Sequence, residues 1–175
     1  MNRIARKALF LAATMLSAAC SPLVLLNATV PSDTYDLVSN ISYGAGVRQK
    51  LDVYRVKPGK PVAGVIVFLY GGSWRQGNRA GYQFVGEAFA RRGYVTVIPD
   101  YRIFPEVKFP AFVEDAALAV RWVKDNIQRF GGPADQVYLM GHSAGAHIAA
   151  LVALDGRYLQ AVGLNGATLK GVVGL

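Results

Sequence analysis

The pentapeptide Gly-His-Ser-Ala-Gly at residues 141–145 constrains the fold of this chain more than any other feature. It lies between an apolar, strand-like run at residues 137–140 and a helix-like run at residues 146–154. A Gly-x-Ser-x-Gly turn between a strand and a helix has to be sharp, so the serine takes a strained backbone and the glycines avoid clashes. The pattern therefore predicts that Ser143 stands exposed as a nucleophile.

The segments before this turn have the patterns of strands. Residues 37–43 and 50–56 are extended segments joined by a glycine-containing turn, which is typical of an antiparallel hairpin. Residues 62–70 are almost uniformly apolar, and residues 94–98 form a second apolar run. Such runs are typical of strands that are buried on both faces of a sheet.

Helical patterns alternate with these strands. A helix is predicted over residues 82–91, and apolar residues recur at helical spacing from Phe112 to Ile127. Residues 169–175 open another strand. The order predicts an α/β fold with a mostly parallel sheet, an antiparallel N-terminal hairpin and helices on both faces. We expect that an apolar edge strand of this kind makes the isolated chain aggregate or fold poorly.

Residues 1–20 form a separate unit. They combine three basic residues, an apolar run at residues 8–16 and a small-residue end at 17–19, which indicates a secretory signal peptide. The apolar run is about half the roughly 20 residues that a spanning helix needs. Residues 21–36 are expected to be a tether, and residues 37–175 a single domain that is incomplete at its C-terminus.

Cys20 is the only cysteine, and it falls at the predicted cleavage point. Its position resembles the lipobox of bacterial lipoproteins, although Ser17 stands where leucine is usual three residues earlier. Two outcomes stay open, lipidation of Cys20 and ordinary secretion after cleavage near Ala19. The predicted location is accordingly the bacterial envelope, either secreted, periplasmic or anchored by lipid, with no other membrane contact.

Composition excludes several classes of function. A hydrophobic fraction of 53% with 17% charged residues suits a globular core, and the net charge of +8 comes from scattered Lys and Arg rather than a stripe. Nucleic-acid binding therefore has little support. One cysteine and two histidines, His142 and His147, form no metal site, and no phosphate-binding glycine pattern is present, so we expect neither metal nor cofactor.

A second glycine-rich turn, Tyr70-Gly71-Gly72-Ser73-Trp74, directly follows the apolar run 62–70. Two glycines at a strand end let backbone N–H groups converge on a carbonyl oxygen. With the N–H of Ala144, just after Ser143, this loop is predicted to form an oxyanion hole.

The chain is similar to α/β-hydrolases, and most closely to the esterase group that includes hormone-sensitive lipase, bacterial feruloyl and acetyl esterases and kynurenine formamidase. The resemblance runs over about residues 37–175, in the family order, through residues 67–74, 99–102, 109–116 and 141–145. It implies that Ser143 is the nucleophile and that the N–H groups of Gly72, Ser73 and Ala144 form the oxyanion hole. Tyr70 departs from the usual histidine, which puts substrate preference in doubt.

Other polar and aromatic residues have less specific roles. Trp74, Tyr101 and His142 are candidates for a substrate pocket, and for Trp74 and Tyr101 buried packing stays open as the alternative. We expect Asp100 and Arg102 to form a structural pair, and Asp115 to cap or solvate the long helix.

The partners that a serine nucleophile needs are a histidine base and a carboxylate, in the order Ser, Asp or Glu, His. His142 adjoins Ser143 and should diverge from it, and His147 lies in the next helix. Asp155 is the only carboxylate after Ser143, and we expect it to form a turn with Gly156. We therefore expect both partners to lie beyond residue 175.

The leading hypothesis is an exported serine hydrolase of small carboxylic esters, which forms an acyl-enzyme on Ser143 and is inactive as these 175 residues alone. Two alternatives stay open. One is an amide hydrolase, resembling kynurenine formamidase or an exopeptidase, and the other is a noncatalytic envelope lipoprotein on a hydrolase scaffold.

Overall fold

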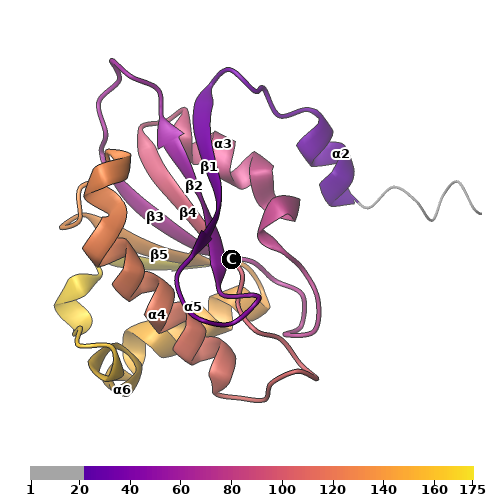
Figure 1. The fold of residues 1–175 in the computed structure, drawn as a ribbon, viewed down its shortest axis with the longest axis vertical. Helices are drawn as coiled ribbons and strands as arrows, with labels where there is room; N and C mark the ends of the chain where they lie inside the picture. The colour runs from indigo at the N-terminus through magenta and orange to yellow at the C-terminus, as the bar shows by residue number, and fades with distance from the viewer. Residues whose placement is uncertain (1–21) are drawn as a thin grey trace, which may run out of the picture.

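The computed structural model describes residues 22–175 of the chain (Figure 1). The predicted signal segment, 1–20, and the lipidation candidate Cys20 lie outside the described residues. Among residues 22–175, none of the helices combines the length and the apolar character that crossing a bilayer requires.

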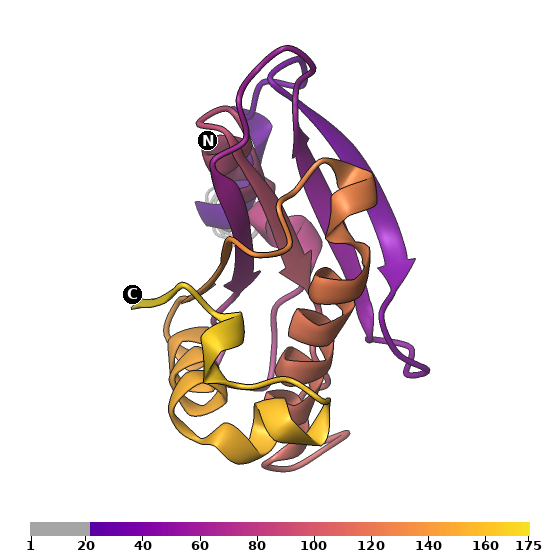
Figure 2. The ribbon, with the colours of Figure 1, turned by 90° about the vertical axis from the view of Figure 1, so that its left-hand side faces the viewer.

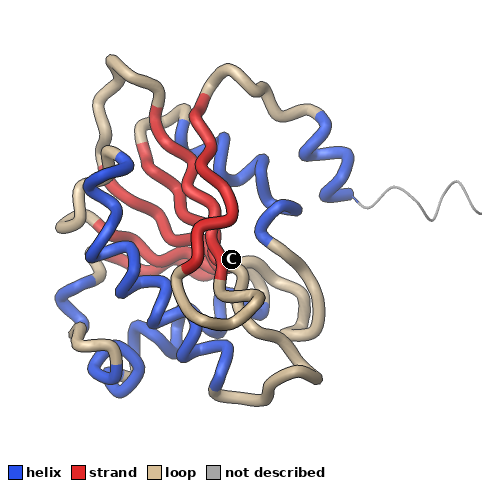
Figure 3. Tube along the Cα trace, in the orientation of Figure 1, coloured by secondary structure: helices blue, strands red, loops and turns tan. Residues whose placement is uncertain are grey.

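The centre of the fold is a six-stranded sheet in the order β1-β2-β4-β3-β5-β6, drawn in red in Figure 3. Strands β3 to β6 run parallel to one another, whereas β2 is antiparallel to both β1 and β4. The predicted α/β fold with an N-terminal antiparallel hairpin is confirmed. The strands are β1 (Tyr35–Ser42), β2 (Lys50–Val56), β3 (Gly64–Leu69), β4 (Tyr94–Pro99), β5 (Val137–Gly141) and β6 (Gly171–Gly174).

Helices cover both faces of this sheet (Figures 1 and 2). On one face lie α2 and α3 with the short helix η1, and on the other lie α4, α5 and α6. The bounds are α2 (Pro22–Ala28), η1 (Arg79–Tyr82), α3 (Gln83–Ala90), α4 (Ala111–Asn126), η2 (Ile127–Phe130), α5 (Ala144–Leu154), α6 (Gly156–Ala161) and η3 (Gly166–Thr168).

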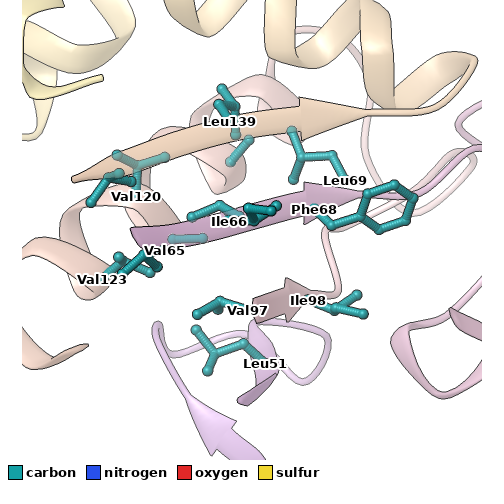
Figure 4. Packing of buried hydrophobic residues seen from close by; sticks show 14 of the residues in the cluster. Leu51, Val65, Ile66, Phe68, Leu69, Val97, Ile98, Val120, Val123 and Leu139 are labelled. Atoms are coloured by element: carbon teal, nitrogen blue, oxygen red, sulfur yellow. The ribbon is translucent and has the colours of Figure 1, made fainter. Parts of the chain in front are cut away.

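Alternation along β3 explains how one strand serves both layers. All six of its residues are buried, and successive side chains point to opposite faces. Figure 4 shows Val120 and Val123 of α4 beside Val65, while Ile66 lines a hollow with Phe89 of α3 on the other face. The uniformly apolar run in the sequence therefore reflects two cores, one on each side.

Two local differences from the sequence-based expectations concern helices. Residues 22–28, expected within a tether, form α2, which packs against η1 and α3. Helix α5 begins at Ala144, directly after Ser143, rather than at residue 146. The second difference matters for the site, because it places Ser143 at the N-cap position of the helix.

Candidate active site

Ser143 occupies the sharp turn between β5 and α5, as the sequence predicts. Its backbone has φ 53° and ψ −118°, in a region that non-glycine residues rarely adopt. The residue is exposed, although both of its strand and helix neighbours, Gly141 and Ala144, are buried. Backbone strain of this kind is characteristic of functional sites, where the surrounding structure holds it in place.

The turn at residues 141–145, the elbow, requires glycine at both of its ends because other backbone atoms approach closely there. A Cβ added to Gly141 would overlap the carbonyl oxygen of Gly145. A Cβ added to Gly145 would overlap the carbonyl oxygen of Leu69 and lie 2.6 Å from that of Tyr70. The elbow is thus pressed against the end of β3, where the second glycine-rich loop begins.

That second loop runs beside the elbow. A Cβ added to Gly71 would lie 3.0 Å from the Cβ of Ser143 and 2.9 Å from Nδ1 of His142. The next three residues, Gly72, Ser73 and Trp74, all have positive φ, at 132°, 52° and 58°. The structure therefore brings together this loop and Ser143, the predicted nucleophile, which lie about seventy residues apart in the sequence.

The predicted oxyanion-hole donors are free to bind a ligand. In the described part of the chain, the backbone N–H groups of Gly72, Ser73 and Ala144 donate no hydrogen bond. The N–H of Ser143, in contrast, donates to the carbonyl of Leu175 at 2.8 Å. Unpaired N–H groups beside an exposed serine are the donors that a developing oxyanion needs.

Tyr70 lies beneath this loop and is fully buried. Its hydroxyl donates to Oδ1 of Asp100 at 2.7 Å and accepts from Nη2 of Arg48 at 3.0 Å. Arg48 also donates to the carbonyl of Gly77 at 2.8 Å, on the far side of the loop. Burial raises the pKa of Tyr70, and the negative charge of Asp100 raises it further. Tyr70 is therefore a neutral support of the loop.

The prediction that Asp100 pairs with Arg102 is wrong. Asp100 accepts instead from the guanidinium and from the backbone N–H of Arg79, and Arg79 also bonds Asp52 at 2.8 Å. Arg79 of η1 reaches Asp100 and Asp52 of β2 only through the folding of distant segments, which spacing in the sequence does not show. Arg79, Asp52 and Arg48 had no signal in the sequence.

Asp115 was expected to cap or solvate α4, and this expectation is also wrong. Its side chain is 1% exposed and accepts from Nη2 of Arg102 and from Nε2 of Gln49, each at 2.7 Å. A buried carboxylate needs such partners, because an unpaired charge would be costly to bury. The pair ties α4 to the segment that follows β4.

The candidate pocket residues fall in three different environments. Trp74 is partly buried, with its ring 6.1 Å from that of Phe112 and 5.4 Å from that of His147. Tyr101 is fully buried, and its hydroxyl donates to the carbonyl of Tyr70 at 2.7 Å. Tyr101 therefore packs beneath the loop, which agrees with the buried alternative for this residue.

His142 is exposed and lines an apolar cavity of about 400 Å³. The cavity lies on the α3 face of the sheet, and its other lining residues are Leu23, Phe68, Tyr82, Phe84, Val85, Phe89, Met140 and Leu175. Of the three pocket candidates, His142 is the one that lines this apolar cavity.

The two histidines form no ion pair in the described structure. The salt bridges among residues 22–175 include neither His142 nor His147, and the ring of His147 meets that of Trp74 edge-on. Asp155 caps α6 by accepting from the N–H of Arg157 at 3.2 Å and pairs with its guanidinium. The hydrogen bond with Arg157 lowers the pKa of Asp155. No potential metal-binding cluster occurs within residues 22–175.

Comparison with known proteins finds relatives that match much of the chain. The BD-FAE family model matches residues 51–166, which is more than half of the chain. The isoprenylcysteine alpha-carbonyl methylesterase ICME of Arabidopsis thaliana is 39% identical over 116 residues, covering 66% of this chain and 27% of that protein. Esterase LipC of Mycobacterium tuberculosis is 38% identical over 118 residues, 65% and 29% of the two chains. The chain thus spans less than a third of the length of these relatives.

Solved structures share the fold. An esterase from Pyrobaculum calidifontis is 30% identical with a TM-score of 0.69, covering 86% of this chain and 48% of that one. Esterase B from Lactobacillus Rhamnosis superposes with a TM-score of 0.76 at 23% identity, over 98% of this chain and 56% of that one. With its α/β-hydrolase sheet and a family match that includes residues 141–145, this chain belongs to the BD-FAE family.

Proposed function

We propose that this protein hydrolyses carboxylic esters through an acyl-enzyme on Ser143. The observation that carries the proposal is the contact between the exposed, strained Ser143 and Gly71, beside three unpaired backbone N–H groups. Two of the similar proteins are named a methylesterase and an esterase, which supports esters as the substrate class.

In the proposed reaction, Oγ of Ser143 attacks the ester carbonyl carbon while a base takes the hydroxyl proton. The carbonyl oxygen becomes an oxyanion that accepts from the N–H groups of Gly72, Ser73 and Ala144. Each such donor contributes on the order of 10² to 10³ in rate. The tetrahedral intermediate expels the alcohol, which receives the proton from the base. Water then attacks the acyl group and releases the carboxylic acid and free Ser143.

The base and its carboxylate are proposed to lie outside these 175 residues. The support is that His142 and His147 are the only histidines in the sequence, and that neither forms an ion pair with a carboxylate among residues 22–175. Without a base, oxyanion stabilisation and binding alone supply on the order of 10³ to 10⁴ over water in a serine hydrolase. We therefore expect little turnover from the 175-residue chain by itself.

We also propose that the protein is exported to the cell envelope. The support is the sequence of residues 1–20, with its basic start, apolar run and small-residue end before Cys20. Mass spectrometry of the N-terminal peptide from an expressing bacterium tests this. A mature chain that begins at or near Cys20 supports export, and an intact Met1 contradicts it.

The kinetic test of the function uses the product of the intact gene. A short-chain nitrophenyl ester and the matching nitroanilide are offered to the wild type and to Ser143→Ala. We expect hydrolysis of the ester, little hydrolysis of the anilide, and loss of turnover in Ser143→Ala. Preference for the anilide would favour the amide-hydrolase alternative, and ester hydrolysis that survives Ser143→Ala would overturn the proposal.

A further inference from the structure

Helix α2 presents an unbroken set of aliphatic side chains to solvent. Its sequence is Pro-Leu-Val-Leu-Leu-Asn-Ala, without a charged residue in either terminal turn. Val24, Leu25 and Leu26 are 57%, 58% and 47% exposed. Single exposed apolar residues are ordinary on protein surfaces, but three consecutive ones on a short helix mark an interaction surface.

The helix is held on the domain in a fixed orientation. Nδ2 of Asn27 donates to the carbonyl of Ala80 at 2.9 Å, and Oδ1 of Asn27 accepts from the N–H of Phe84 at 3.2 Å. Leu23 points the other way, into the apolar cavity that Phe84 also lines. Figure 1 shows α2 at the periphery of the fold, next to α3. The exposed aliphatic set is therefore a stable part of the surface.

The sequence that precedes α2 favours a membrane as the partner of this surface. Twenty-one residues come before Pro22, and they include three basic residues, the apolar run 8–16 and Cys20. Retention of that run or lipidation of Cys20 would each deliver the first turn of α2 to a bilayer. Aliphatic side chains without polar partners suit the boundary between headgroups and acyl chains.

We propose that α2 docks on a phospholipid bilayer by inserting Val24, Leu25 and Leu26. A single acyl chain or a short apolar segment binds membranes only marginally, and stable attachment takes two signals. Helix α2 supplies the second signal beside the N-terminal one. Leu23 and His142 line the same cavity, so docking sets the side of the molecule that carries this cavity toward the lipid.

A site-resolved label tests the docking independently of how the N-terminus is anchored. Cys20 is the only cysteine, so a Cys20→Ser full chain accepts one nitrobenzoxadiazole label at Leu25→Cys. The matched control carries the label at Leu154→Cys, because Leu154 is 86% exposed at the end of α5. Vesicles of phosphatidylcholine and phosphatidylglycerol are added, with and without brominated lipid.

We expect the label at residue 25 to brighten on binding and to be quenched by brominated lipid, while the label at residue 154 does neither. Failure of the chain to bind vesicles would contradict the proposal, as would an unresponsive label at residue 25 on bound chain. Equal responses at the two positions would mean nonspecific adsorption. Shielding of residue 25 before vesicles are added would show that a second copy or residues 1–21 cover α2, and would also overturn it.

A second comparison measures the contribution of the three side chains. Val24→Ser, Leu25→Ser and Leu26→Ser together should weaken vesicle partitioning on the order of 100-fold, since each side chain is about half exposed beforehand. Leu154→Ser should leave partitioning unchanged. Ser143→Ala should also leave it unchanged, so failure of docking and failure of the proposed esterase activity are separate results. Undiminished partitioning of the triple variant would overturn the proposal.

Discussion

Gly71 lies so close to Ser143 that a Cβ added to it would stand 3.0 Å from the Cβ of the serine. Gly71 follows β3 and Ser143 follows β5, and these two strands are neighbours in the parallel sheet. The carboxyl ends of parallel strands meet at one edge of a sheet, which is where α/β folds place their ligands. The contact therefore fixes the glycine-rich loop at residues 70–74 relative to Ser143.

Gly71→Ala should separate the loop from the elbow. The φ of Gly71 is not in the positive region, so alanine is excluded by the close contacts with Ser143 and His142 rather than by the backbone. We expect kcat/KM for an ester in the intact gene product to fall by about 10² to 10³, the effect of losing one oxyanion donor. Gly166→Ala is the matched control, because nothing lies within 4 Å of its added Cβ. Equal activity of the two variants would contradict the assigned role of the loop.

Gly145→Ala should impair folding rather than catalysis alone. The added methyl would overlap the carbonyl of Leu69 at the end of β3, and neither backbone segment can rotate away. We expect a loss of about 3 kcal/mol in the free energy of unfolding, the upper range for overpacking a close contact. Denaturant titration measures it. Gly156→Ala, where the added Cβ meets only the side chain of Gln160 at 3.5 Å, should be neutral.

Stability should fall in alkali because of the buried tyrosines. Burial raises the pKa of Tyr70 and of Tyr101, so both keep their protons in the folded state above the pH at which they lose them when unfolded. Their contribution to the free energy of unfolding is complete below about pH 10, the pKa of tyrosine in the unfolded chain. Above that pH, the free energy of unfolding declines by about 1.4 kcal/mol per pH unit for each of the two groups.

Unfolding free energy measured across that range checks this expectation, with phenolate absorbance as the second readout. In Tyr101→Phe, the free energy of unfolding should decline less steeply with pH, because one of the titrating groups has been removed. If all nine tyrosines ionised near pH 10 while the chain stayed folded, the burial of Tyr70 and Tyr101 would be contradicted.

The edge of the sheet at β6 should promote self-association of the 175-residue chain. β6 is an outer strand of the described sheet, and Val172 and Val173 are 41% and 42% exposed. An exposed apolar edge strand is open to pairing with another chain, and a lysine there blocks it. We expect Val173→Lys to reduce aggregation in light scattering, whereas Leu154→Lys does not. A wild-type chain that stays monodisperse would contradict this.

The sequence was sufficient for the sheet, the elbow and the loop because each is a local pattern. Uniform apolar runs specify strands buried on two faces, and Gly-x-Ser-x-Gly specifies a turn that few other residues can form. The support beneath the loop was not predictable. Tyr70, Asp100 and Arg79 meet from a strand end, the segment after β4 and a short helix, and their pairing depends on tertiary approach.

The same limit applies to Tyr101 and Asp115, whose surroundings depend on tertiary packing. Tyr101 is aromatic and follows a strand end, as a pocket residue would, but its hydroxyl is used by the carbonyl of Tyr70. Asp115 lies on an amphipathic helix, where charge usually faces water, but its neighbours Arg102 and Gln49 come from other segments and allow it to be buried. Side-chain identity sets what a residue can do, and packing decides which of these roles it takes.

Covalent labelling of Ser143 tests directly whether this serine is the nucleophile. The product of the intact gene is treated with a fluorophosphonate, digested, and mapped by mass spectrometry beside Ser143→Ala. We expect a single phosphonyl adduct on the peptide that contains Ser143, and no adduct in the variant. A folded product that carries no adduct, or carries it on another residue, would contradict the assignment of Ser143 as the nucleophile.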